Sequence, residues 1–259
     1  MPKLNHIGSN AFAGCTNLYL VALPDSVEKI ESAAFNKCSS IRLRKLPSSL
    51  TLLGGTAFQT SGLEKCDLST ATNLQEIGAN AFAYCYNLES PNGIPKYIKT
   101  LGNGVFSDDS KLTFELSANL YPSLETVGKN AFSRTGLIIK SLPESLKKIY
   151  SWAFGLLTSE GHTLESIPSK VVHLGTDAFR GLKWFDTNTQ GSLTILNPSV
   201  VQKDDGDATG EGYHSMALNG INGYSALRAV NTDVVQILRN TNGLGSNIGD
   251  IGVERGENL

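Results

Sequence analysis

IGSNAFAGCTNL, residues 7–18, decides the fold because the chain repeats its pattern. An apolar residue is followed by Gly, then by Ala-Phe, then by Cys and Leu. The Phe of the Ala-Phe pair recurs at intervals of 22–26 residues, as Phe12, Phe35, Phe58, Phe82, Phe106, Phe132, Phe154 and Phe179. Such a period is typical of a solenoid, because one unit cannot bury its apolar face alone and neighbouring units must stack. We therefore expect Phe35 and Phe82 to be almost fully buried.

Other positions of the unit keep the same phase. An Ile, Leu or Val lies five residues before each Phe, and Gly follows it in six of the eight units. Gly suits a tight bend, but Glu31 and Tyr150 replace it, so a positive φ is not required in every unit. The position two residues before Phe is mostly a turn former. Segments such as residues 18–23 (LYLVAL) and 26–30 (SVEKI) predict strands of about 3–5 residues.

Residues 23–41 (LPDSVEKIESAAFNKCSSI) and 142–154 (LPESLKKIYSWAF) resemble the BspA-like leucine-rich repeat, whose pattern is LPxSΦxxIGxxAFxxCxxL. The resemblance covers residues 4 to about 198. It implies a mostly β leucine-rich-repeat solenoid of about eight units. Members of that family are mostly surface or secreted proteins of host-associated microbes, linked to adhesion. The resemblance thus implies an extracellular or cell-surface solenoid that binds a protein partner, and it implies no reaction.

Composition and motifs exclude several other classes. A net charge of -2 argues against nucleic acid as a main partner, and no apolar run is long enough to span a membrane. No catalytic motif such as G-x-S-x-G, H-E-x-x-H or Walker A occurs, so we predict no enzyme and no cofactor. Residues 205–212 match the first half of a calcium loop, but Met216 stands where its Glu is required. We therefore predict an acidic turn there and no metal site.

The four cysteines have a structural interpretation. Cys15, Cys38 and Cys85 each lie three residues after a Phe, and Cys66 aligns with Val21. We expect four free, buried thiols that act as small apolar groups. A disulfide between Cys15 and Cys38, in adjacent units, is geometrically conceivable.

Outward positions of the predicted strands form a grid that a partner could contact. The candidate partner-facing residues are Tyr19, Arg42, Arg44, Lys45 and Lys65, with Tyr84 and Tyr86 as an aromatic pair near a turn. Arg42, Arg44 and Lys45 form the densest basic patch, although a solvated strand face is the simpler interpretation. Arg44 aligns with the core position of Val21 and Cys66, which suggests a shift of register.

The two ends of the repeat array differ from its middle. The first unit begins abruptly and leaves a free strand edge, so we expect residues 1–10 to contact a neighbour or a missing cap, with self-association through the solenoid ends. Pro198 opens a ninth unit without Ala-Phe, which predicts a solenoid over residues 1–198 and a C-terminal cap or docking segment over 199–259. The spacing of Leu227, Val230, Val234 and Leu238 predicts one face of a helix.

The first ten residues contain no apolar stretch of a secretory signal. This favours an alternative function, a structural or assembly protein of a larger particle such as a virion, or a chain excised from a longer one.

Overall fold

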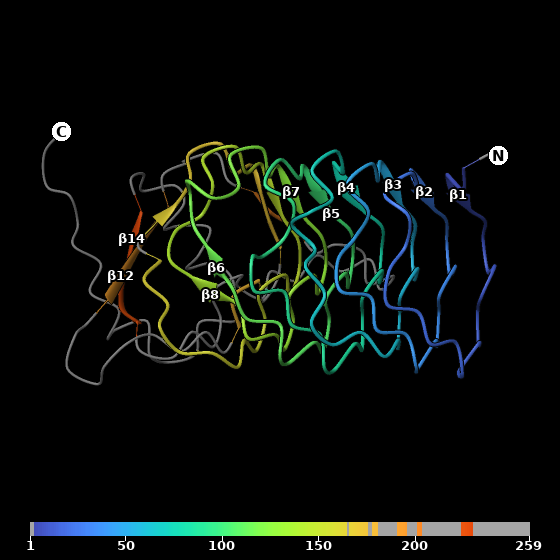
Figure 1. Cartoon of the computed structure of the whole chain (residues 1–259). Coiled ribbons are helices and arrows are strands. Elements are labelled where there is room, and N and C mark those ends of the chain that lie inside the picture. Colours follow the sequence, from blue (N-terminus) through green and yellow to red (C-terminus); the bar gives the residue numbers. More distant parts are fainter. Residues whose placement is uncertain are drawn as a thin grey trace, which may run out of the picture.

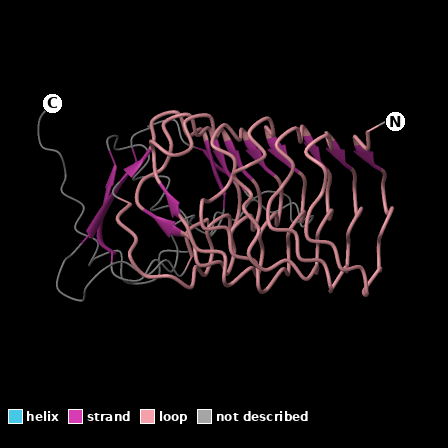
Figure 2. Ribbon diagram, in the orientation of Figure 1, coloured by secondary structure: helices cyan, strands magenta, loops and turns pink. Residues whose placement is uncertain are grey.

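The computed structural model describes residues 3–164, 166–175 and 178–180, and beyond them three strands, Gly191–Ile195, Val201–Lys203 and Tyr224–Ala229. In this part of the chain the backbone winds into a solenoid whose turns lie side by side from one end to the other (Figure 1). The described residues contain strands and turns but no helix. Figure 2 shows that most of each turn is loop.

One edge of every described turn adds a strand to a parallel sheet. In the described part of the chain this sheet has nine strands in the order β1 (His6–Ile7), β2 (Lys29–Ile30), β3 (Leu52–Leu53), β4 (Glu76–Ile77), β5 (Thr100–Leu101), β7 (Thr126–Val127), β9 (Lys148–Ile149), β11 (His173–Gly175) and β13 (Val201–Lys203). From β1 to β9 each strand has two residues, of which the second is buried. The strands are therefore shorter than predicted.

A second row of pairing follows the Phe of the later units. Strand β6 (Glu115–Leu116) pairs with β8 (Ile138–Ile139), and β10 (Ser166–Ile167) pairs with β12 (Gly191–Ile195), which pairs with β14 (Tyr224–Ala229). Nearer the N-terminus only isolated bridges form, between Lys45 and Asp67 and between Lys65 and Glu89. The prediction of a strand over residues 18–23 is wrong, because the first turn makes no such pair.

A column of stacked Phe rings runs along the core. The centroids of neighbouring rings are 5.1–5.8 Å apart, and the ring planes are nearly parallel. Every ring from Phe35 to Phe179 is fully buried, which confirms the prediction for Phe35 and Phe82. Phe12 is 37% exposed, because in the described residues no turn covers its outer face.

Left-handed residues flank each Phe and bend the backbone twice per turn. The positions two before and two after Phe have φ between 54° and 73° in every unit from Phe12 to Phe154. At these positions the N–H group donates to the next turn, as Asn10 does to Ser32 and Gly14 to Asn36. The repeated Gly has another purpose: a Cβ at Gly54 would lie 2.5 Å from the backbone nitrogen of Ser32 in the preceding turn. Gly is therefore needed at this position because neighbouring turns approach closely, and not because the backbone has a positive φ.

The described residues test only some of the predictions for the C-terminal part of the chain. Strand β13 lies just beyond residue 198 and joins the main sheet, while the division of the chain at that residue stays a prediction. Leu227 lies in strand β14, so the predicted helix face does not begin there. The wrong inference came from spacing alone, which fits a helix as well as it fits part of an extended strand. Val230, Val234 and Leu238, and the acidic turn at 205–212, lie outside the described residues.

Three of the four cysteines are buried, and all four are free. Cys38 donates its thiol to the carbonyl of Phe12, and Cys85 donates to that of Phe58, both at 3.0 Å. The prediction of a buried thiol is wrong for Cys15, which is exposed because it belongs to the uncovered first turn. The disulfide between Cys15 and Cys38 is not formed.

We expect one reactive thiol in the native protein. Burial raises the pKa of Cys66 to about 12 and also raises the pKa of Cys38 and Cys85, while thiol reagents attack the thiolate. An aromatic disulfide reagent should therefore modify Cys15 rapidly and the other three only after unfolding in guanidinium. Rapid native-state modification of more than one thiol would contradict the burial of this column.

Candidate partner-binding surface

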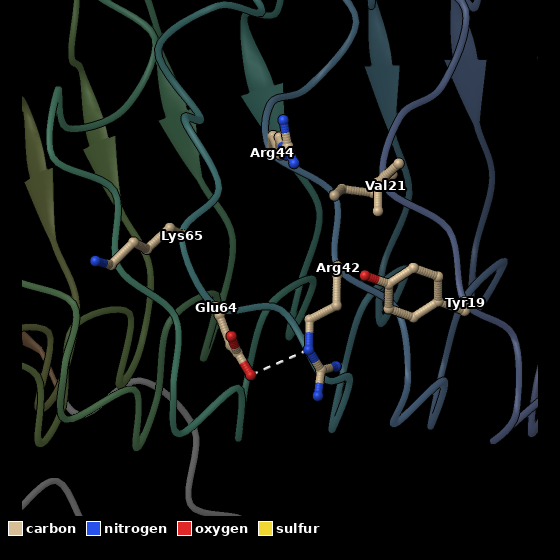
Figure 3. Close-up of a pocket in the computed structure, with 7 residues that line it drawn as sticks. Tyr19, Val21, Arg42, Arg44, Glu64 and Lys65 are labelled. Atoms are coloured by element: carbon tan, nitrogen blue, oxygen red, sulfur yellow. Dashed lines mark ion pairs between the residues drawn. The ribbon is translucent and has the colours of Figure 1, made fainter.

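A half-open pocket of about 310 Å³ lies across the first three turns (Figure 3). Its lining residues are Tyr19, Val21, Arg42, Leu43, Arg44, Glu64 and Lys65. We call this site the basic pocket. Four of its residues are candidates from the sequence: Tyr19, Arg42, Arg44 and Lys65. They meet because equivalent segments of successive turns lie next to one another, so side chains from all three turns line the same surface.

Arg42 is the fixed wall of the basic pocket. Its Nη1 donates to the carbonyl oxygens of Ser39, Ile41 and Gly62, and its Nε lies 3.0 Å from Oε1 of Glu64. Gly62 makes room for this arrangement, because a Cβ there would overlap the Ser39 carbonyl and Arg42 Nη1. The guanidinium is thus held by the backbone of two turns, and its charge is paired (Figure 3).

Arg44 and Lys65 supply the free positive charge. Both side chains are exposed, and neither forms an ion pair with any described residue. Lys65 extends away from Arg44, so the two charges lie at different margins of the pocket (Figure 3). The predicted register shift at Arg44 resolves simply: Leu43 and Leu46 enter the core while Arg44 and Lys45 face outward.

Lys45 does not line the basic pocket. Its Nζ lies 3.1 Å from Oδ2 of Asp25, so its charge is paired with a carboxylate of the first turn. The hydrogen bonds from Lys45 and from the Ser48 backbone lower the pKa of Asp25, which keeps that carboxylate ionised. The basic patch predicted from the sequence is therefore divided, with Arg44 on the pocket and Lys45 beside it.

Apolar groups complete the lining. Leu43 is buried and forms part of the floor, while Val21 and Tyr19 of the first turn remain 39% and 73% exposed. The residue pattern did not single out Val21 or Leu43, because it assigned Val21 to a core position, and Leu43 is itself buried. The backbone holds these walls together, since Arg42 and Arg44 donate N–H groups to the carbonyls of Leu20 and Val21.

The aromatic pair lies elsewhere on the solenoid. The rings of Tyr84 and Tyr86 are 6.2 Å apart with an interplanar angle of 56°, and both are exposed. Tyr97 is a further exposed aromatic that the sequence analysis missed, with the Lys96 ammonium 5.5 Å from its ring centroid. None of these three residues lines the basic pocket.

The lining of the basic pocket consists of cationic, aromatic and apolar side chains with one carboxylate, Glu64. Among the described residues the structure brings together no three side chains of the His, Cys, Asp or Glu type that could hold a metal ion. Nor does any segment in this part of the chain form a helix with the length and apolarity needed to cross a lipid bilayer.

The repeat geometry and the sequence agree on a family. A family profile described as the BspA type leucine rich repeat region matches six copies over residues 5–121 and 75–204. The chain belongs to this family. Two strands of the BspA-type repeat, β1 and β13, bound the matched region almost to the residue.

Solved structures of other leucine-rich repeat proteins are similar to this BspA-type chain. A leucine-rich repeat protein from Bacteroides ovatus is 24% identical, with a TM-score of 0.43, and the match covers 78% of this chain and 73% of that one. A leucine rich cell surface protein from Faecalibacterium prausnitzii is 21% identical, with a TM-score of 0.41 and coverages of 86% and 65%. The T. pallidum leucine rich repeat protein is 23% identical, with a TM-score of 0.38 and coverages of 63% and 65%. No curated protein matches the sequence.

Proposed function

We propose that this chain is a non-catalytic, protein-binding solenoid that serves adhesion or recognition at a microbial surface. The basic pocket is the observation that carries the proposal, because it places an exposed Tyr and two free cations on a rigid repeat scaffold. Tyr and Arg are favoured anchors of protein interfaces. Membership of the BspA-type family supports a binding role, and the same resemblance supports a surface location.

Capture from the native setting tests this function. The chain is immobilised, exposed to the proteins it meets in that setting, and the retained proteins are identified. We expect a retained protein that is lost with Tyr19→Ala/Arg44→Ala and kept with the control Leu120→Ala/Lys148→Ala, which alters exposed residues outside the pocket. Antibodies should label intact producing cells. Retention of no protein, or labelling only after permeabilisation, would contradict the proposal.

A second candidate that we propose is an assembly role in a larger particle. Among the described strands β1 pairs only with β2, and no described strand pairs with its other edge. The N–H groups of Asn10, Phe12 and Gly14 all point to the second turn, which leaves acceptors on the outer side of this arc. A turn of a further copy would complement such a face by presenting N–H donors to these acceptors.

Sedimentation over a range of concentrations tests the assembly role. Phe12→Asp places a charge where the next ring would stack, so we expect it to abolish association, whereas Tyr86→Asp, at an exposed site away from this end, should not. A wild-type chain that stays monomeric at every concentration would remove the assembly candidate.

A further inference from the structure

Charge pairing in and beside the basic pocket leaves a local surplus of positive charge. Arg42 is paired with Glu64, and Lys45 with Asp25. Arg44 and Lys65 have no carboxylate within ion-pair distance among the described residues. The chain as a whole has a net charge of -2, so this surplus is a feature of the site and not of the protein.

The apolar lining sets the size of what the pocket holds. A volume of about 310 Å³ is at the small end of ligand pockets, enough for one or two side chains. Val21 and Tyr19 expose apolar surface beside the cations. A strand face that is merely solvated would not need this apolar surface. A ligand that matches both parts carries negative charge around an apolar or aromatic group.

The pocket is organised before any ligand arrives. Three backbone carbonyls and Glu64 fix the guanidinium of Arg42, and N–H groups of the second turn bind carbonyls of the first. Groups that are already ordered lose little conformational freedom on binding, which reduces the cost of association. A ligand that makes only a few contacts can therefore bind to this pocket with measurable affinity.

We propose that the basic pocket binds an acidic peptide segment of a protein partner. Carboxylates of that segment pair with Arg44 and Lys65, and an apolar or aromatic side chain packs on Val21 and Tyr19. This inference rests on the proposed protein-binding function and specifies its partner. A sulfated polysaccharide fits less well, because two free cations are few for a polyanion.

Fluorescence anisotropy with a defined probe tests the inference. The probe is a labelled short peptide of Asp and Glu around one Phe, and its matched control replaces Asp and Glu by Asn and Gln. We expect the acidic peptide to bind and to lose affinity as salt rises. Arg44→Glu/Lys65→Glu should lower its affinity by about tenfold or more. Lys29→Glu/Lys148→Glu changes the same net charge at exposed positions of the main sheet and should leave the affinity unchanged.

The other results either overturn the inference or separate it from the proposed function. Equal binding to the two double variants, equal binding of the neutral peptide, or no binding of either peptide overturns it. A heparin fragment that binds more tightly than the peptide, and is lost with Arg44→Glu/Lys65→Glu, replaces the peptide by a sulfated glycan. If a captured protein binds the Arg44→Glu/Lys65→Glu variant as well as it binds the wild type, the pocket inference fails while the proposed function stands. If the acidic peptide binds but no protein is captured, the pocket still binds acidic peptides while the proposed function fails.

Discussion

Phe82→Ala lowers the free energy of unfolding by about 3–5 kcal/mol, the largest loss we expect from any single truncation in this chain. The ring is fully buried between Phe58 and Phe106, at centroid distances of 5.6 and 5.5 Å. Its removal leaves a cavity that rigid neighbouring turns cannot fill, because the hydrogen bonds of the Ala-Phe segment fix their separation. Urea unfolding followed by circular dichroism measures the loss.

Phe12→Ala is the matched control. It removes the same ring from the same position of the repeat, but Phe12 is 37% exposed and stacks on one side only. We expect a loss of roughly 1–2 kcal/mol, because less apolar surface leaves water on folding. Equal losses for Phe12→Ala and Phe82→Ala would mean that the ring column does not carry the stability of the solenoid.

The repeat phase made the core of the middle turns predictable. Each Phe, the preceding Ala or Val, and the apolar residue of each strand recur at fixed offsets, so burial in one unit implies burial in the next. The same reasoning failed at the first turn, where Phe12 and Cys15 are exposed. A column predicts what a residue contacts only when a turn lies on both sides of it, and the sequence pattern of a unit does not contain that information.

The candidate site was predictable in part for a related reason. Alignment of successive units placed Tyr19, Arg42, Arg44 and Lys65 near one another, and the structure brings them to one pocket. It did not reveal which cations are free. Arg42 is bound to three carbonyls across two turns, and Lys45 turns to Asp25, contacts that depend on the exact stacking of loops. Which charges are free therefore depends on the folded structure, in which Arg44 and Lys65 form no ion pair with a described residue.

Asp109 is a buried carboxyl at the position three residues after Phe106, a column that also contains Cys38, Ser61, Cys85 and Thr135. Its Oδ1 accepts the N–H of Cys85 at 2.7 Å, and its Oδ2 is buried without a hydrogen-bond partner. Burial raises the pKa of Asp109 well above its ordinary value, the charge of Asp108 adds to the increase, and the Cys85 N–H opposes it. The folded chain therefore holds a proton that the unfolded chain releases near pH 4.

Asp109→Asn should stabilise the protein at neutral pH. Between the pKa of the unfolded chain and the higher pKa of the folded one, the native state binds more protons than the unfolded state, so the free energy of unfolding of the wild type falls as pH rises. The fall attributable to Asp109 is at most about 1.4 kcal/mol per pH unit, and the Asn variant lacks it because its amide is neutral at every pH. The two proteins should thus be similar near pH 4 and diverge above it, with the variant the more stable.

Urea unfolding at half-unit steps from pH 4 to pH 8 measures this divergence. Asp25, Glu31 and Glu125, whose pKa values are lowered by hydrogen bonds and nearby positive groups, contribute equally to both proteins and cancel in the difference. Glu144→Gln is the control, since it removes an exposed carboxylate away from Asp109 and should bring no gain in stability at neutral pH. Parallel profiles for the wild type and Asp109→Asn would mean that the Asp109 carboxyl does not retain its proton in the folded chain. Contacts other than the Cys85 N–H would then stabilise the ionised carboxylate.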